Sequence, residues 1–447
     1  MTGSIPRRDF LLGSLAVAGG VNVLGRRAAA DEAPTSAEAA AWRRCSANDR
    51  LAIAVMGTNG RGHALALAFA KQEGVDVATI CDVDSEVAAR TTAALSSERG
   101  QQPKQEGDIR RVLDDPAIDA LVIAAPDHWH APATVLACQA GKHVYVEKPA
   151  CHNPREGELM VAAAEKYDRR VQLGTQRRSS PEVRQAIERM QAGELGRVRM
   201  ARSWIASIRP SIGHGREVDP PARLNYDLWQ GPAPREPYRD NVIHYHWHWF
   251  WTWGTGELGN NGIHGLDLCR LAMQVDCPRE VVCGGGRLFF DDDQQTPDTE
   301  LATFCFGERG SDERLIHWEH RTWHRHGGRG RDWGVEFYGD QGTLTLDSAG
   351  WEILDRDGKQ TAQVKISNGE PEHLANFCAA IRSGTPLQAP IDAGVSSTLL
   401  CHLGNIAYRT SSTVNLDPAT KQLADTSSSE QKSLWSREYA PGWEVKV

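Results

Sequence analysis

A glycine-rich turn between an apolar segment and a helical pattern constrains the fold of this chain more than any other feature. Residues 51–56 form an apolar run of strand length, and Gly57-Thr58-Asn59-Gly60-Arg61-Gly62 comes directly after it. A helical pattern begins at His63, a second strand-like run covers 75–81, and Asp82 follows it. We therefore predict a strand, a tight turn, a helix and a second parallel strand that ends at an acidic residue.

This arrangement is typical of a dinucleotide site. A tight turn at the start of a helix brings backbone N–H groups to a pyrophosphate. The carboxylate of Asp82 is placed to accept both ribose hydroxyls and would repel a 2′-phosphate, which favours NAD over NADP. Asn59 replaces the usual middle glycine, and asparagine tolerates a left-handed backbone better than other non-glycine residues. The expected cofactor ligands here are Gly57, Asn59, Gly60, Arg61, Gly62 and Asp82.

Strand and helix patterns keep alternating up to residue 175. Apolar strand-like runs cover 119–126, 143–146 and 171–174, with helical patterns between them. This alternation predicts a doubly wound parallel sheet, whose ligands lie at the carboxyl ends of the strands. Five further residues come after strands in this way and are expected to contact the cofactor: Pro126, His130, Glu147, Lys148 and Gln176.

Beyond residue 180 the alternation stops. After a helix over 181–191, strands are predicted at 196–204, 281–290, 300–306, 315–323 and 334–346. Runs of strands without helices between them indicate a largely antiparallel sheet. Helices over 372–382 and 395–409 are expected to pack back against the core. We expect an α/β chain with a Rossmann domain at 50–175 and a second α/β domain at 176–447.

Three motifs together resemble the glucose–fructose oxidoreductase and inositol dehydrogenase family (Gfo/Idh/MocA). They are the turn ending at Gly62, the Ala-Pro-Asp-His-Trp-His130 segment and Glu147-Lys148-Pro149. The resemblance covers about 50–447. It implies a Rossmann domain followed by an open, mostly antiparallel sheet that often forms an oligomer interface, so a dimer or tetramer is expected. It also implies NAD(P)-dependent oxidation or reduction of sugars and polyols.

A stretch near the middle of the chain is similar to the start of that family's catalytic helix, usually D-x-G-x-H-x-x-D. Gly262, His264 and Asp267 match it, but Asn260 stands where the family has the first aspartate. The resemblance implies that His264 and Lys148 handle the alcohol proton. We expect His264, with a pKa near neutrality, to act as the base and Lys148 to stabilise the alkoxide. Asn260 cannot take a proton at neutral pH but can orient a hydroxyl or the imidazole.

An aromatic segment, His244-Tyr-His-Trp-His-Trp-Phe-Trp-Thr-Trp253, precedes this motif. If it is extended, its tryptophans share one side and its histidines the other. The ring of Trp251 or Trp253 would then form a face of a sugar pocket, with His248 and Asp267 also binding the substrate. Three alternating histidines are a possible zinc site, but packing of the tryptophans is the favoured explanation, and we expect no metal.

The N-terminus has the pattern of an export signal. Arg7-Arg8 precedes a mildly apolar Gly- and Ala-rich stretch, and Ala28-Ala29-Ala30 offers a cleavage site. We expect a twin-arginine signal over 1–30, recognised by the Tat machinery, a linker over 31–49, and a periplasmic or exported protein without a membrane span after cleavage. The net charge of −8 with no basic block argues against nucleic acid. The ten cysteines form no C-x-x-C pair, so no disulfide framework is expected.

The leading hypothesis is an exported NAD-dependent oxidoreductase that acts on a secondary alcohol of a sugar, polyol or glycoside. A first alternative is a glycosidase or lyase that oxidises C3 transiently, eliminates the anomeric group and recycles its NAD. A second alternative is a carbohydrate- or cofactor-binding protein without turnover, for which Asn260 is the main support.

Overall fold

The computed structural model describes residues 50–447. The predicted signal over 1–30, with its Arg7-Arg8 pair, and the predicted linker over 31–49 lie outside the described residues. Within 50–447, no helix is both long and apolar enough to span a membrane.

Six parallel strands form the first sheet in the order β3-β2-β1-β4-β5-β6, which confirms the predicted doubly wound fold. The strands are β1 (Leu51–Met56), β2 (Val75–Cys81), β3 (Lys104–Glu106), β4 (Ala120–Ile123), β5 (His143–Val146) and β6 (Val171–Leu173). The intervening helices are α2 (Arg61–Ala70), α3 (Ser85–Arg99), α4 (Ile109–Leu113), α5 (Asp127–Gln139) and α6 (Pro154–Lys166).

The central strands β1 and β4 are apolar along their whole length, as expected of strands with helices on both faces of the sheet. In β1, Ala54 and Met56 join the apolar cluster that includes residues of α5 and α6. Ile53 and Val55 point the other way, into the cluster that contains Phe69 of α2. The polar groups that come after the strands are therefore gathered at the carboxyl edge.

The second sheet has ten strands in the order β14-β13-β12-β11-β7-β10-β9-β8-β15-β16. Only the β7–β10 pairing is parallel, so the predicted, mostly antiparallel sheet is confirmed. The strands are β7 (Val198–Ala206), β8 (Glu280–Gly286), β9 (Thr299–Phe306), β10 (Arg314–Arg321), β11 (Trp333–Gly339), β12 (Gly342–Asp347), β13 (Trp351–Asp355), β14 (Gln360–Val364), β15 (Val414–Asp417) and β16 (Gln422–Leu423). The single strand predicted over 334–346 is wrong, because the chain turns at Asp340-Gln341 and pairs with itself as β11 and β12.

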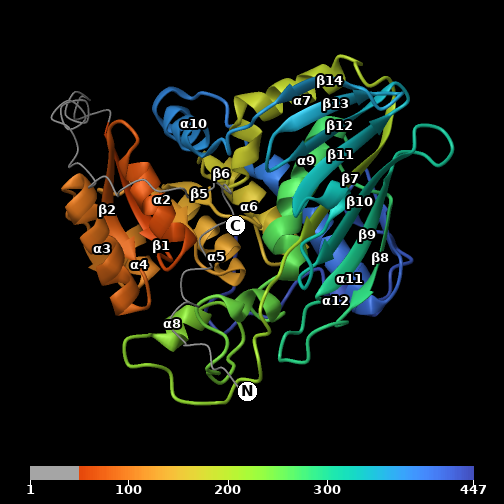
Figure 1. Cartoon of the computed structure of the whole chain (residues 1–447). Helices are drawn as coiled ribbons and strands as arrows, with labels where there is room; N and C mark the ends of the chain where they lie inside the picture. Colours follow the sequence, from red (N-terminus) through yellow and green to blue (C-terminus); the bar gives the residue numbers. More distant parts are fainter. Residues whose placement is uncertain (1–49) are drawn as a thin grey trace, which may run out of the picture. The chain divides into compact units, whose positions relative to one another are not determined.

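Helices cover one face of this sheet, where α9 and α11 run along the strands (Figure 1). They also reach the first domain: α11 packs on α6, and Phe377 of α10 meets Phe69 of α2 with ring centroids 6.1 Å apart. The helices of this half are α7 (Pro181–Gln191), α9 (Ile263–Met273), α10 (Glu370–Ser383), α11 (Ile391–Thr410) and α12 (Ser429–Ser433).

A long insert over 207–256 separates β7 from the π-helical turn (Leu258–Gly262) that leads into α9. It contains α8 (Tyr226–Gln230) and a short 3₁₀ helix, η3 (His246–Trp249). The extended conformation predicted for its aromatic segment is therefore wrong. Helical turns let the large rings leave solvent and pack together, as Trp229, Trp247, Trp249 and Trp253 do in one apolar cluster.

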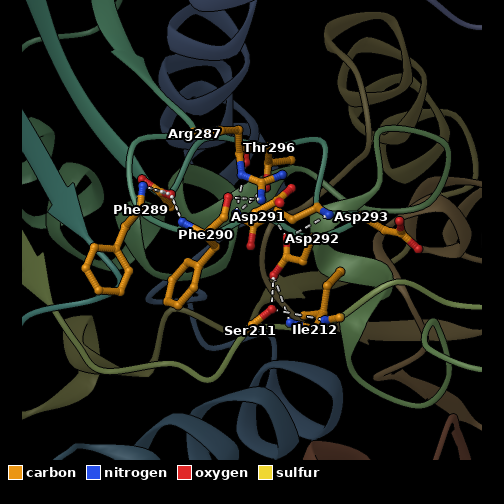
Figure 2. Close-up of polar contacts among 12 residues, drawn as sticks. Ser211, Ile212, Arg287, Phe289, Phe290, Asp291, Asp292, Asp293 and Thr296 are labelled. Carbon is orange, nitrogen blue, oxygen red and sulfur yellow. Dashed lines mark hydrogen bonds and ion pairs between the residues drawn. The ribbon is translucent and has the colours of Figure 1, made fainter.

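An acidic loop after β8 anchors this insert. Asp292 accepts hydrogen bonds from Arg287 (2.6 Å), from the Ser211 hydroxyl (2.8 Å) and from the Ile212 N–H (2.8 Å), as Figure 2 shows. Within 50–447, no group of three or more His, Cys, Asp or Glu side chains is arranged to hold a metal ion. The Asp292 carboxylate is thus occupied by protein donors and positions the insert.

Candidate active site

Two glycines of the glycine-rich turn, Gly57 and Gly62, leave no room for a side chain. Gly57 has a positive φ of 78°, and a Cβ there would lie 2.7 Å from the backbone of Ala125. A Cβ on Gly62 would lie 1.8 Å from the carbonyl oxygen of Gly57. Asn59 does not adopt a positive φ, so the left-handed conformation that we expected there is not needed. These two glycines let the backbone of the turn pass close to its neighbours, as a pyrophosphate-binding turn requires.

Asp82 follows β2 and points back to this turn. Its Oδ2 accepts hydrogen bonds from the backbone N–H (2.6 Å) and hydroxyl (3.1 Å) of Thr58, and its Oδ1 accepts from the Asp84 N–H (2.9 Å). Burial raises the pKa of Asp82, and these hydrogen bonds oppose the shift. Oδ1 keeps unused lone pairs on a half-buried side chain, as a ribose-binding carboxylate requires.

Lys148 and Asn260 meet although 112 residues separate them. The Lys148 ammonium donates to the backbone oxygen of Asn260 at 2.7 Å and to its side-chain Oδ1 at 3.1 Å. Asn260 lies in a π-helical turn (Leu258–Gly262) that leads into α9. Burial lowers the pKa of Lys148, and neighbouring carboxylates, among them Glu147 and Asp127, oppose that shift.

His264 lies in the first turn of α9, half-buried, with no hydrogen-bond partner on Nδ1. Burial lowers its pKa well below the ordinary value, and the charges of Lys148 and Arg177 lower it further. We expected a pKa near neutrality, and the buried, positively charged surroundings correct that expectation. The imidazole is consequently neutral at physiological pH, with a ring nitrogen free for a ligand.

Glu147 and Arg61 were expected to contact the cofactor, but they are paired with each other. Arg61 donates to the Glu147 carboxylate at 2.8 Å and also contacts Glu370 of α10. Burial alone would raise the pKa of Glu147, but the charges of Arg61 and Lys148 hold it below its ordinary value. This pair joins the helix after the glycine turn to the strand end that carries Lys148.

His130 and Gln176, which were also expected to bind the cofactor, differ in whether their polar atoms already have partners in the protein. His130 is buried, and its ring nitrogens lie 2.6 Å from the Pro149 carbonyl oxygen and 2.8 Å from that of Ala125. This ring therefore braces two strand ends and is not directed at a ligand, which corrects our expectation. Gln176, by contrast, has a buried side-chain oxygen without a partner at the carboxyl edge where we expected it. Pro126 precedes α5 at the same edge.

Asp267 was expected to bind substrate, but its carboxylate is already occupied. Both of its oxygens accept hydrogen bonds from Arg178, at 2.6 and 2.7 Å, and Oδ1 also accepts from the Ser397 hydroxyl at 2.6 Å. Its side chain is 2% exposed. We therefore correct its role to that of a structural anchor for α9.

The tryptophans expected to form a sugar platform are used elsewhere. Trp253 is buried and packs edge-on against Trp229, with ring centroids 5.3 Å apart. Trp251 lies under the guanidinium of Arg409 and lines a separate small cavity with His152 and His402. No contact places either ring beside His264, because the segment folds into turns and does not run as an extended strand.

His248, the remaining expected substrate ligand, stacks on Trp247 with ring centroids 3.6 Å apart. Its Nδ1 lies 2.6 Å from the Tyr245 carbonyl oxygen. Burial lowers the pKa of His248 to about 3. The charge of Lys148 also lowers this pKa, whereas the hydrogen bond to Tyr245 opposes the shift. His248 is thus neutral and within electrostatic reach of Lys148.

Two charged residues at the site were not singled out in the sequence. Glu257 is buried, is paired with Arg209 at 3.0 Å and opposes the lowered pKa of Lys148. Arg177 follows β6 and adds to the lowered pKa of His264. The arginine pair at 177–178, directly after a buried strand, and the glutamate three residues before Asn260 were the available signals.

Comparisons with known proteins agree with this arrangement of an NAD-binding Rossmann domain and a C-terminal α/β domain. Residues 51–175 match the family model described as "Oxidoreductase family, NAD-binding Rossmann fold", and 213–298 match the model of the same family's "C-terminal alpha/beta domain". Both models describe one oxidoreductase family, Gfo/Idh/MocA, and they match two separate parts of the chain.

Curated relatives match only part of the chain. A protein of Saccharopolyspora erythraea named "Glycosyl hydrolase family 109 protein" is 28% identical over 201 residues, which are 43% of this chain and 44% of the relative. The levoglucosan dehydrogenase of Pseudarthrobacter phenanthrenivorans is 26% identical over 191 residues, 43% of this chain and 41% of the relative. The match thus spans less than half the length of these relatives.

A solved structure of levoglucosan dehydrogenase in complex with NADH and levoglucosan has the same fold. It superposes with a TM-score of 0.64 at 18% identity, covering 82% of this chain and 99% of that chain.

Proposed function

We propose that this protein is an NAD-dependent oxidoreductase that acts on a secondary alcohol of a sugar, polyol or glycoside. The observation that carries the proposal is the convergence of Lys148, Asn260 and the free nitrogen of His264 beside a dinucleotide-binding turn. Relatives named as sugar dehydrogenases support the substrate class.

The residues present fit NAD. The backbone of 57–62 would hold the pyrophosphate, Asp82 the ribose hydroxyls, and the unpartnered Gln176 oxygen the carboxamide. When bound, the nicotinamide supplies the acceptor for the hydride that leaves the alcohol carbon. The buried, unpartnered oxygen of Gln176 is the structural sign that a polar ligand group belongs there.

Proton transfer is the task of the chain's own side chains. His264 is neutral and has a free ring nitrogen, so it can accept the proton of the substrate hydroxyl. Lys148 supplies a positive charge that stabilises the developing alkoxide. Asn260 takes no proton; its two oxygens hold the Lys148 ammonium in place.

We also propose that the protein is exported through the twin-arginine pathway and forms a dimer or tetramer. The Arg7-Arg8 pair and the small-residue cleavage site support export. Export in a folded state favours a tightly held NAD, since the periplasm has no free NAD pool. Cell fractionation of the full chain and of an Arg7→Lys/Arg8→Lys variant tests this: an unaltered location in the double variant would contradict it.

The enzymatic proposal is tested by the absorbance of the purified NAD-loaded protein mixed with a panel of sugars and glycosides. An oxidoreductase builds up NADH, which is read in the near ultraviolet. His264→Ala and Lys148→Ala should each lower kcat by about 10²–10⁴-fold, whereas Lys71→Ala, an exposed lysine after α2, should not. Loss of activity in the Lys71 variant, or none in the other two, would contradict these roles.

A second candidate function is glycoside cleavage in which oxidation is transient and the cofactor is recycled. The relative named as a member of glycosyl hydrolase family 109 favours it. The same experiment distinguishes the two: aglycone released without accumulation of NADH supports cleavage. If neither NADH nor aglycone appears while NAD and sugar both bind, the protein is a binding protein without turnover.

A further inference from the structure

Arg177 carries a charge that the described chain leaves unbalanced. It lies in a short 3₁₀ helix, η2 (Gln176–Ser179), directly after β6. Its guanidinium carbon lies 3.7 Å from the ring centroid of Trp333, the first residue of β11. Within residues 50–447, no carboxylate pairs with this guanidinium and no carbonyl oxygen accepts from it.

The other arginines at the site have carboxylate partners, so the lack of a counter-ion for Arg177 among the described residues is unusual there. Arg178, its neighbour, forms the bidentate pair with Asp267. Arg61 is paired with two glutamates, and Arg209 with Glu257. Each of those arginines has a carboxylate as counter-ion, although Arg61 Nη2 and Arg209 Nε are buried without a hydrogen-bond partner in the described part of the chain. Arg177 has an aromatic ring on one side, while its N–H donors are free to meet a ligand.

Arg177 is half-buried, which leaves it reachable but poorly hydrated. Burial lowers its pKa to about 10, so the guanidinium keeps its charge at neutral pH. A poorly solvated cation without a counter-ion is costly to keep, and a bound anion would remove that cost. A carboxylate matches the planar guanidinium best because the two can form parallel hydrogen bonds.

The contacts around Arg177 direct it to the catalytic residues. Gly174, three residues before it, lies against the Glu147 carboxylate, where a Cβ would come within 2.8 Å of Oε1. Trp333, on which it stacks, is two residues from Val335, and Val335 lies beside Gly265, the residue after His264. Arg177 and Lys148 both lower the pKa of His264, and no acidic side chain raises it. The charges that act on His264 are therefore positive.

We propose that the substrate is a sugar acid whose carboxylate pairs with Arg177 while its hydroxyl meets Lys148 and His264. This inference rests on the proposed function, since it names the substrate class of the same site. The indole of Trp333 supports the guanidinium from behind and fixes its plane, so that bidentate recognition becomes specific for a carboxylate.

Matched pairs of sugars test the proposal on the NAD-loaded protein. Glucuronate is compared with glucose, and galacturonate with galactose, by KM and kcat for NADH formation. We expect each acid to be preferred through a lower KM. Arg177→Gln should raise KM for the acid by about 10- to 100-fold and KM for the neutral sugar far less, and Arg177→Lys should restore part of the loss. Arg184→Gln, an exposed arginine on α7, is the control and should change neither.

Two outcomes would overturn the inference. Equal KM values for the acid and the neutral sugar would show that no carboxylate is recognised. An equal fall of kcat on both sugars in Arg177→Gln would show that the guanidinium stabilises the alkoxide and not a substrate carboxylate.

A binding measurement separates this inference from the proposed function. Calorimetric titration of the NAD-loaded protein with glucuronate should show binding that Arg177→Gln abolishes, even if no NADH forms. Binding of this kind without turnover would support the carboxylate site at Arg177 and contradict the oxidoreductase activity. Turnover of neutral sugars without binding of acids would support the oxidoreductase activity and contradict the carboxylate site.

Discussion

Burial lowers the pKa of both His264 and Lys148, but the neighbouring charges act on the two groups in opposite directions. Burial disfavours the charged form of both side chains. For His264 the nearby cations add to that effect, so the ring stays neutral. For Lys148 the nearby carboxylates resist it, and the Asn260 oxygens bind the ammonium. A neutral base thus lies beside a charged electrostatic partner.

The pH dependence of kcat/KM should reflect this. Because the pKa of His264 is lowered, the base stays unprotonated as the pH falls through 6.5, the ordinary value, and activity should decline only below it. Because the pKa of Lys148 is lowered, the alkaline decline should begin below 10.5. The measurement is kcat/KM as a function of pH. Activity recovered after return to neutral pH shows whether acid has unfolded the protein irreversibly. An acid limb at or above 6.5 would contradict the assigned surroundings.

Asp82 should decide the cofactor. Its carboxylate suits free ribose hydroxyls and repels a 2′-phosphate. Wild type should bind NAD more tightly than NADP, and Asp82→Ala should weaken NAD binding and relax the rejection of NADP. Titration of both cofactors by fluorescence measures this. If the wild-type protein prefers NADP, the role given to Asp82 is wrong.

The helix α9 carries His264, and its position depends on a buried ion pair. The bidentate contact between Asp267 and Arg178 ties this helix to the segment after β6. Gly265 allows the same helix to lie close to β7, where a Cβ would come within 1.8 Å of the Ser203 hydroxyl oxygen. His264 is thereby held between the segment after β6 and the second sheet by contacts within the protein.

Removing one partner of this pair should cost stability more than affinity. In Asp267→Asn the Arg178 charge stays buried without its counter-ion, and we expect a loss of about 3–5 kcal/mol in the free energy of unfolding. Asp276→Asn removes a carboxylate just after α9 that is 57% exposed and pairs with Arg270 and Lys421, and it should cost less than about 1 kcal/mol. Urea unfolding measures both. A raised substrate KM with unchanged stability in Asp267→Asn would restore the substrate-binding role.

Across the whole molecule, the insert over 207–256 fastens the second domain to the first beside Asp82. The Asn225 N–H donates to the Val83 carbonyl oxygen at 2.9 Å, and the Ser85 N–H donates to that of Arg223 at 3.1 Å. Arg223 and His244 both reach the buried Asp84 carboxylate, at 3.1 and 3.0 Å. The contacts enclose the strand end expected to hold the ribose.

Loosening this contact should speed cofactor release. Arg223→Ala removes an ion pair next to the expected ribose site, so NADH should dissociate several-fold faster while the melting temperature changes little. Arg216→Ala, which breaks the exposed pair with Asp240 inside the insert, is the matched control. Stopped-flow displacement of NADH measures the rates. Equal rates in the two variants would show that the insert does not retain the cofactor.

The parts of the protein that the sequence predicted are those whose signal is local. Three signals depend only on residues close together in the chain: the periodicity of strands and helices, the steric limits on Gly57 and Gly62, and the acidic residue after β2. The carboxyl edge of a parallel sheet also brings together the residues next to each strand end. Lys148 could therefore be singled out in advance, whereas Asn260 and His264 were singled out because their segment resembles the start of the family's catalytic helix. The mostly antiparallel second sheet was predicted from runs of strands in the same way.

Only the tertiary structure decided which side chains are free to act. Asp267, His130 and Trp253 are residue types that often bind ligands. Here the polar atoms of Asp267 and His130 bond to protein groups, and Trp253 is buried in an apolar cluster. The aromatic segment alternates like a strand, yet burial of its rings favours a 3₁₀ turn over an exposed extended chain. Arg177 and Arg178 are identical neighbours in the sequence. A carboxylate 89 residues from Arg178 neutralises one of them, and the other stays unpaired because no carboxylate of the described chain reaches it.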